Sequence, residues 1–175
     1  MITHAGEPEK TIIMPSEAGQ LFPNKGQGHI FYMEMALKQA ASAFKKDEVP
    51  IGAVVIQGNA VVGRGYNQRE TLKDPTAHAE IMAMRDASKN LSNYRLTGCD
   101  IYVTIEPCTM CVGAMVHARI RQIFFGALEP RAGALTSQLQ LMKDGHFNHS
   151  ILWEGGILAD QCAAVLRDFF RQRRS

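Results

Sequence analysis

The sequence predicts an α/β fold in which a central, mixed five-stranded sheet carries helices on both faces. Stretches with helical periodicity alternate with β-branched stretches, in the order α-β-β-α-β-α-β-α-β-α. The first two β stretches are separated only by Gly58-Asn59, so they must pair antiparallel. The third, DIYVTI over residues 100–105, is rich in β-branched and aromatic residues, which is typical of a buried strand.

The regular part of the chain begins with an amphipathic helix over residues 29–46. Its apolar side chains recur every three to four residues and form one stripe: Ile30, Met33, Leu37, Ala40, Ala41 and Phe44. Two β-branched strands follow over 51–57 and 60–66. Residues 1–28 are polar with scattered Gly and Pro, so we expect them to form an N-terminal extension. The remaining residues, 29–175, are expected to form one domain with a sizeable core.

Two prolines mark the predicted starts of the next two helices. Asp74-Pro75 offers an N-cap and a proline suited to the first helical position, which predicts a helix over 75–91. Residues 100–105 form a buried strand, and the proline after it opens a helix over 107–117.

The last part of the chain supplies two more strands and the final helix. We expect strands over 121–127 and 150–155, with a short helix within 135–144 between them. A helix over 158–174 ends the chain. Its apolar face consists of Leu158, Cys162, Val165, Leu166 and Phe169.

Composition restricts the partners and the compartment. The net charge is only +2, so no global positive field demands nucleic acid. Positive charge gathers at the C-terminal end, where Arg167, Arg171, Arg173 and Arg174 accompany Phe169 and Phe170. The sequence contains neither a secretory signal nor an apolar run of about 18 residues. We therefore expect a cytoplasmic protein whose cysteines are reduced, as metal ligands or packed thiols.

A histidine and a cysteine pair have the spacing of a metal site. Cys108 and Cys111 are three residues apart, so they share one face of a first helical turn. The free N–H groups and the helix dipole there favour thiolate over thiol. His78 lies near the start of the preceding helix. Two helix starts that face each other at strand ends would bring these three side chains together around zinc.

Three protein ligands leave a fourth tetrahedral position for water, which is typical of catalytic zinc. Water in that position loses a proton near neutral pH. Glu80 lies two residues beyond His78, near enough to move this proton without being a ligand. The alternative is a non-catalytic RNA-binding protein with structural zinc, whose fourth ligand would be Cys99, Cys162 or His117.

His-Ala-Glu combined with Pro-Cys-x-x-Cys is the signature of the zinc-dependent cytidine and nucleobase deaminases. Outside it, the chain resembles bacterial tRNA-specific adenosine deaminases from about Ile30 to Arg174. The stretches that carry the resemblance are VPIGAVVI, GYNQ, DPTAHAEIMA, NYRLTGCDIYVTIEPCTMCVGAMVHARI and GILADQCAAVLRDFFRQRR. The resemblance implies a three-layer α/β/α cytidine-deaminase-like fold. It also implies conversion of adenosine to inosine at the wobble position of a tRNA anticodon loop.

The resemblance further implies the roles of individual residues. His78, Cys108 and Cys111 match the ligands of one Zn²⁺ per chain, which carries a bound water or hydroxide. Glu80 matches the proton-shuttling glutamate, and Asn67 matches an asparagine that holds the target nucleotide.

The C-terminal helix matches the part of the family that cradles the anticodon loop. Phe170 and Arg171 supply an aromatic face and positive charge, the two features that single-stranded RNA requires. Phe169 fits the apolar stripe, so we expect Phe170 rather than Phe169 to stack on a base. The alternative is a solvated helix end whose arginines complement the helix dipole.

One loop departs from the family pattern. Where the family usually has Asp-x-Lys-x-Gly-Ala, this chain reads Glu-Pro-Arg-Ala-Gly-Ala over residues 129–134. Arg131 keeps the positive charge, but Pro130 stiffens the loop and removes a backbone donor, and Leu128 is also atypical. We expect this loop to contact RNA with altered geometry.

The expected partners follow from the same resemblance. They are a tRNA anticodon stem-loop, that of an arginine tRNA, and a second copy of the chain in a homodimer whose interface includes the stretch GAMVHARI. A deaminase of free bases or nucleosides, such as guanine, cytosine or cytidine, is the alternative enzyme, because it would share every zinc residue.

Overall fold

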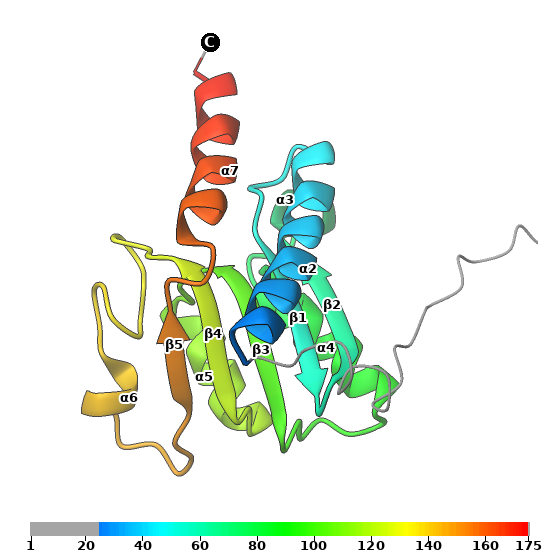
Figure 1. The fold of residues 1–175 in the computed structure, drawn as a ribbon, viewed down its shortest axis with the longest axis vertical. Helices are drawn as coiled ribbons and strands as arrows, with labels where there is room; N and C mark the ends of the chain where they lie inside the picture. Colours follow the sequence, from blue (N-terminus) through cyan, green and yellow to red (C-terminus); the bar gives the residue numbers. More distant parts are fainter. Residues whose placement is uncertain (1–24, 175) are drawn as a thin grey trace, which may run out of the picture.

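The fold is built around a five-stranded sheet with the strand order β2-β1-β3-β4-β5 (Figure 1). The computed structural model describes residues 25–174; most of the predicted extension lies outside these residues. The strands are β1 Gly52–Gln57, β2 Ala60–Tyr66, β3 Cys99–Ile105, β4 Gln122–Ala127 and β5 Leu152–Gly155. β1 pairs antiparallel with β2 and β3, whereas β3, β4 and β5 are parallel. The predicted mixed sheet is confirmed.

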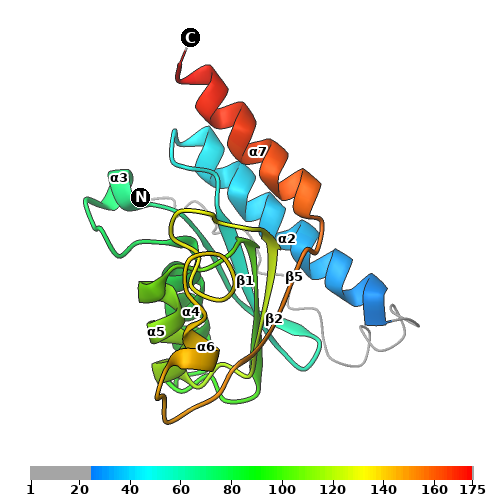
Figure 2. The same ribbon diagram turned by 90° about the vertical axis from the view of Figure 1, so that its left-hand side faces the viewer.

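Helices cover both faces of this sheet. They are α2 Lys25–Lys45, α3 Arg69–Leu72, α4 Ala79–Asn90, α5 Thr109–Ala118, α6 Leu141–Asp144 and α7 Ala159–Gln172. Figure 2 shows α2 and α7 side by side on one face, with α4 and α5 on the other. This double cover explains why β3 is buried at every position, including its polar residues Asp100 and Thr104. Within residues 25–174, no helix combines the length and apolar character needed to cross a membrane.

Small residues bring α4 unusually close to β2. A Cβ atom added at Gly65 would lie 2.3 Å from the backbone nitrogen of Ala83, and one at Gly63 would lie 2.4 Å from its carbonyl oxygen. On α4, every fourth position facing β2 is a fully buried alanine: Ala79, Ala83 and Ala87. This contact fixes the place where α4 begins, and the start of α4 carries His78 and Glu80.

Three loops with predicted site residues meet at one edge of the sheet. β2 and β3 are both antiparallel to β1, so they run in the same direction, as does β4. The loops after β2, β3 and β4 therefore leave the sheet at its upper edge in Figure 1. They contain Asn67, Cys108 and Arg131, respectively. Clefts at the carboxyl ends of strands are the usual ligand-binding places of such sheets.

The prediction that Asp74-Pro75 opens a helix is wrong. α4 begins at Ala79, with His78 as its N-cap. The carboxylate of Asp74 instead accepts hydrogen bonds from the backbone nitrogen and the hydroxyl of Thr76, at 2.8 and 2.7 Å. This local turn competes with helix formation, as Asp side chains often do.

Other helix boundaries differ more modestly from the prediction. α5 begins at Thr109 rather than at Pro107, with Cys108 as its N-cap. α2 begins at Lys25, before the predicted start at His29, because Gly26 and Gly28 hide a helical turn from sequence reasoning. The four-residue α3 was not predicted, since it is too short to show periodicity.

Candidate metal centre and active site

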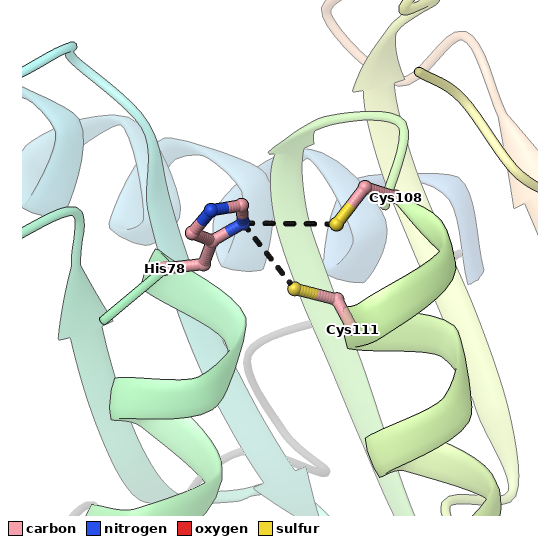
Figure 3. Close-up of side chains that lie close together, drawn as sticks. All are labelled: His78, Cys108 and Cys111. Atoms are coloured by element: carbon pink, nitrogen blue, oxygen red, sulfur yellow. Dashed lines mark hydrogen bonds between the residues drawn. The ribbon is translucent and has the colours of Figure 1, made fainter. Parts of the chain in front are cut away.

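The starts of α4 and α5 face each other and present three potential metal ligands (Figure 3). His78 is the N-cap of α4, Cys108 is the N-cap of α5, and Cys111 lies in the first turn of α5. Neither N-cap side chain makes a capping hydrogen bond, so both point away from their own helices and towards the shared space. The predicted convergence of two helix starts is therefore observed.

The distances in this group fit a tetrahedral zinc ion. Nδ1 of His78 lies 3.7 Å from Sγ of Cys108 and 3.6 Å from Sγ of Cys111. Around zinc, with bonds of about 2.3 Å to sulfur and about 2.0 Å to nitrogen, these atoms would lie about 3.6 Å apart. All three ligand atoms lie within 4.8 Å of one another. The donor set, one imidazole and two thiols, is also one that zinc prefers.

The cysteines and histidine proposed as a fourth structural ligand lie outside this group. Within residues 25–174, the three-membered cluster includes neither Cys99, Cys162 nor His117. Cys99 and Cys162 are buried in the two hydrophobic cores, and burial raises the pKa of each thiol to about 11. Both behave as packed apolar side chains.

Without a metal, the cluster shares protons among its own members. A hydrogen bond from Cys111 lowers the pKa of Cys108 to about 4, and His78 contributes in the same direction. The same bond, together with burial, raises the pKa of Cys111. The contact with Cys108 also raises the pKa of His78. These directions favour the thiolate form of Cys108 and the thiol form of Cys111, so binding of zinc through both sulfurs would release the proton of Cys111.

Glu80 brings a buried carboxyl group beside these ligands. It occupies the second position of α4 and is 3 % exposed. Burial raises its pKa to about 6, against the attraction of His78. Its carboxyl group contacts the thiol of Cys111 but does not belong to the ligand cluster. A carboxyl group whose pKa lies near neutrality can both take and return a proton.

Asn67 is held at the same edge by a residue that sequence reasoning missed. Its backbone nitrogen donates to the carbonyl of Ile51 at 3.0 Å, and its side-chain nitrogen reaches Glu48 Oε2 at 3.5 Å. Glu48 is 1 % exposed and also accepts a bond of 2.6 Å from the backbone nitrogen of Thr71. Burial favours the neutral acid, but the bonds from Thr71 outweigh it and lower the pKa of Glu48. The acceptor-only carboxylate therefore fixes the orientation of the Asn67 amide.

Glu106, which precedes Pro107-Cys108, is a second buried carboxylate that sequence reasoning missed. Backbone nitrogens of the loop after β4 surround it, and Ser137 also donates its hydroxyl hydrogen. Burial would raise its pKa, but the donors of Ser137 and Thr136 prevail and lower it. The available signal was a charged residue directly after a strand that is predicted to be buried, a place where a carboxylate must find donors.

The predicted RNA contacts lie apart from the metal cluster. Phe170 is 45 % exposed, whereas its neighbour Phe169 is buried against the ring of Phe44. The predicted division of roles between the two phenylalanines agrees with this burial. Arg171 forms an exposed ion pair with Asp168. These residues lie on α7, which projects beyond the sheet edge from the opposite face (Figures 1 and 2).

Arg131, the third predicted RNA contact, lies on the loop after β4. Its side chain is exposed, and its backbone nitrogen donates to the carboxylate of Glu129 at 2.9 Å. α7 projects beyond the edge of the sheet from which the loop after β4 also leaves, so both exposed, arginine-bearing segments lie at this end of the fold (Figure 1).

Comparison with known proteins agrees with this geometry. The MafB19-like deaminase family matches residues 27–174. The tRNA-specific adenosine deaminase of Haemophilus influenzae is 43% identical over 143 residues, which cover 81% of this chain and 83% of that protein. The tRNA-specific adenosine deaminase of Bacillus subtilis is 41% identical, over 82% of this chain and 89% of its own length.

Solved structures place the fold in the same group. One, from a study of A-to-I editing by tRNA:A34 deaminases, is 42% identical, with a TM-score of 0.75 over 78% of this chain and 99% of that one. The guanine deaminase from Nitrosomonas europaea shares the fold, with a TM-score of 0.71 but only 20% identity. Relatives above 40% identity and a family match over almost all the described residues show that the chain belongs to the deaminase family, among the tRNA-specific adenosine deaminases.

Proposed function

We propose that the chain catalyses the hydrolytic deamination of adenosine to inosine at the wobble position of a tRNA anticodon loop. The observation that carries this proposal is the cluster of His78, Cys108 and Cys111 with the buried Glu80 beside it. The similarity to tRNA-specific adenosine deaminases supports the substrate. The guanine deaminase, at 20% identity, supports the alternative of a free base only through its fold.

The three clustered side chains would hold one zinc ion per chain. When bound, zinc would supply a Lewis acid that makes water a nucleophile near neutral pH. Nδ1 of His78 and the two Sγ atoms are the donors, and the N-cap position of Cys108 at the start of α5 favours its thiolate form.

Glu80 moves the protons of the reaction. Its carboxylate takes a proton from the water that attacks C6 of adenine and delivers this proton to N1. It then transfers the remaining hydroxyl proton to the amino nitrogen. The C6–N bond breaks, ammonia leaves, and C6 keeps the oxygen as a carbonyl group. The near-neutral pKa of Glu80, about 6, suits a group that accepts and donates in the same turnover.

Asn67 orients the base by hydrogen bonding, and Glu48 orients Asn67. Because Glu48 accepts a bond from the amide nitrogen, the amide oxygen faces away from Glu48. The target nucleotide therefore meets one defined arrangement of donor and acceptor.

The anticodon loop would contact the two exposed segments around this edge. Phe170 would stack on an unpaired base, while Arg171 and Arg131 would lie near phosphates. An arginine tRNA is the proposed substrate, and the cytoplasm, where tRNA is used, is the proposed compartment.

A homodimer is the proposed assembly. An apolar groove of about 360 Å³ runs between α4 and α5 and includes residues of the stretch GAMVHARI. It is lined by Ile81, Met84, Arg85, Ser88, Tyr94, Ala114, His117 and Ala118. In a two-fold dimer, the apolar surface around this groove would pack against the same surface of a second copy.

Incubation with total bacterial tRNA, followed by sequencing for inosine, tests the proposal. Inosine should appear at the wobble position of an arginine tRNA, where the sequence read changes from A to G. A panel of guanine, cytosine and cytidine provides the contrast. Ammonia release from one of these compounds, with no inosine in any tRNA, would favour the free-base alternative.

A further inference from the structure

Glu106 holds one irregular loop through an unusual number of hydrogen bonds. Its carboxylate is 1 % exposed. Oε1 accepts from the backbone nitrogens of Leu135, Thr136 and Ser137, at 3.1, 2.7 and 2.9 Å. Oε2 accepts from the backbone nitrogen of Glu129 at 3.2 Å and from the hydroxyl of Ser137. All five donors belong to the segment 129–137, so one side chain gathers both ends of this loop.

The same loop is attached to the turn that carries the metal ligands. The backbone nitrogen of Ala134 donates to the carbonyl of Pro107 at 2.9 Å, and Gly133 forms an isolated bridge with Cys108. A Cβ atom at Gly133 would lie 2.3 Å from Glu106 Oε2. Glycine at position 133 thus lets the loop close over the carboxylate without displacing it.

Segment 129–137 contains no helix or strand, and four of its backbone nitrogens donate to Glu106: those of Glu129, Leu135, Thr136 and Ser137. A bond within the loop, from the nitrogen of Gly133 to the carbonyl of Glu129 at 2.9 Å, and the bond from Ala134 to Pro107 supplement these contacts. The loop also exposes Arg131 at the edge where the substrate is expected, next to Leu128, which is 57% exposed. Glu106 is thus the buried acceptor that ties the two ends of this exposed loop together.

We propose that Glu106 is a positioning residue for RNA recognition: it holds segment 129–137 in the shape that engages the anticodon loop. This inference rests on the proposed function. Both oxygens of Glu106 accept hydrogen bonds from the loop, so Glu106 does not contact the reacting groups. Its loss should raise KM for RNA much more than it lowers kcat.

Glu106→Gln tests this inference, because it replaces one acceptor oxygen with an amino group that faces backbone N–H donors. We expect KM for an anticodon stem-loop to rise about tenfold or more, as for loss of bonds to a charged acceptor, with kcat changed less than about threefold. Gly133→Ala disturbs the contact between the loop and the Glu106 carboxylate from the loop side. It should likewise raise KM more than it lowers kcat. The matched controls are Glu154→Gln, on the exposed β5, and Gly26→Ala, where an added Cβ meets nothing within 4 Å.

Two further measurements separate positioning from catalysis. RNA affinity is measured with Glu80→Ala as the parent, so that turnover plays no part, and Glu106→Gln should weaken it by a similar factor. Amide hydrogen exchange follows residues 129–137 without RNA, and their exchange should accelerate in the variant. Ser137→Ala removes one donor only and provides a milder test if Glu106→Gln does not fold.

Parallel loss of zinc and of kcat with unchanged RNA affinity would overturn the inference and make Glu106 part of the metal scaffold. Unchanged amide exchange over 129–137 would overturn it as well. If the unmodified protein forms no inosine in RNA, the proposed function fails instead. The exchange experiment then still decides whether Glu106 holds the loop.

Discussion

The metal cluster and the exposed end of α7 represent two ways in which this chain positions functional groups. In the cluster, His78 and Cys111 are held by helix starts that pack closely on the sheet, and their distances leave little freedom. At the end of α7, Phe170 and Arg171 lie on one helix that projects into solvent. The proposed chemistry uses buried groups with fixed neighbours, whereas the proposed substrate recognition uses exposed groups that would acquire their neighbours from RNA.

This difference explains how readily each region can be identified from sequence. A buried metal ligand has few chemical substitutes, so its residue type and spacing carry a clear signal. An exposed Phe beside Arg has many ordinary explanations, including a solvated helix end. We expect substitutions in the two regions to differ accordingly, with large effects on turnover in the first and modest effects on affinity in the second.

The largest expected effect is that of Glu80→Ala. Removal of the proton-transferring group should lower kcat by a factor of about 10² to 10⁴, as for loss of a general acid–base catalyst. Zinc content should stay near that of the unmodified protein, because Glu80 lies outside the ligand cluster. Single-turnover deamination of a stem-loop and metal analysis provide the measurements. Glu34→Ala, on the exposed face of α2, is the control. Near-normal turnover in Glu80→Ala would remove Glu80 from the mechanism.

The second prediction concerns the two kinds of cysteine. In zinc-free protein at pH 7, iodoacetamide should modify Cys108, whose pKa is about 4, before Cys99 or Cys162, whose pKa values are about 11. At pH 7, Cys108 holds roughly ten-thousandfold more thiolate than Cys99 or Cys162, but a thiolate of lower pKa is a weaker nucleophile. The resulting rate advantage of Cys108 is about tenfold, and the burial of Cys99 and Cys162 increases it. Peptide mass spectrometry against time measures the rates.

Zinc should protect Cys108 in the same experiment, since a coordinated thiolate is less available to the reagent. Circular dichroism of the zinc-free protein ensures that it is still folded. If Cys108 reacts no faster than Cys99 in folded protein, the proposed charge distribution of the cluster is wrong.

Sequence reasoning reached the sheet, the helices on both faces and the convergence of His78, Cys108 and Cys111. These features follow from periodicity and from ligand spacing, which are local properties. The start of α4 was misplaced, because Asp74 uses its carboxylate in a turn with Thr76 instead of capping a helix. A helix start at Asp74-Pro75 and a turn between Asp74 and Thr76 are both compatible with the local sequence. Only the packing of α4 against β2 decides between them.

Glu48 and Glu106 could not be assigned from sequence for a different reason. Their donors come from segments far away in the chain: the backbone of Thr71 for Glu48, and residues 129–137 for Glu106. A glutamate beside a buried strand indicates that donors must exist but does not indicate which segment provides them. Long-range polar contacts of this kind become visible only when the loops are placed in space.

The smallest expected effect separates two adjacent phenylalanines. Phe170→Ala should weaken binding of an anticodon stem-loop by about tenfold, within the range of roughly 1–3 kcal/mol for one base stacked on an aromatic ring. Thermal stability should change little, because Phe170 is 45 % exposed. Phe169→Ala should do the reverse and lower the melting temperature, since its ring packs against Phe44 and beneath the guanidinium of Arg173.

Fluorescence anisotropy with labelled RNA and thermal melts measure this contrast. Leu152→Ala, an exposed apolar truncation on β5, is the control for a general loss of surface area. Equal affinity in Phe170→Ala and the control would leave the end of α7 as an ordinary solvated helix. RNA recognition would then have to come from other exposed residues, of which Arg131 on the loop after β4 is the one proposed above.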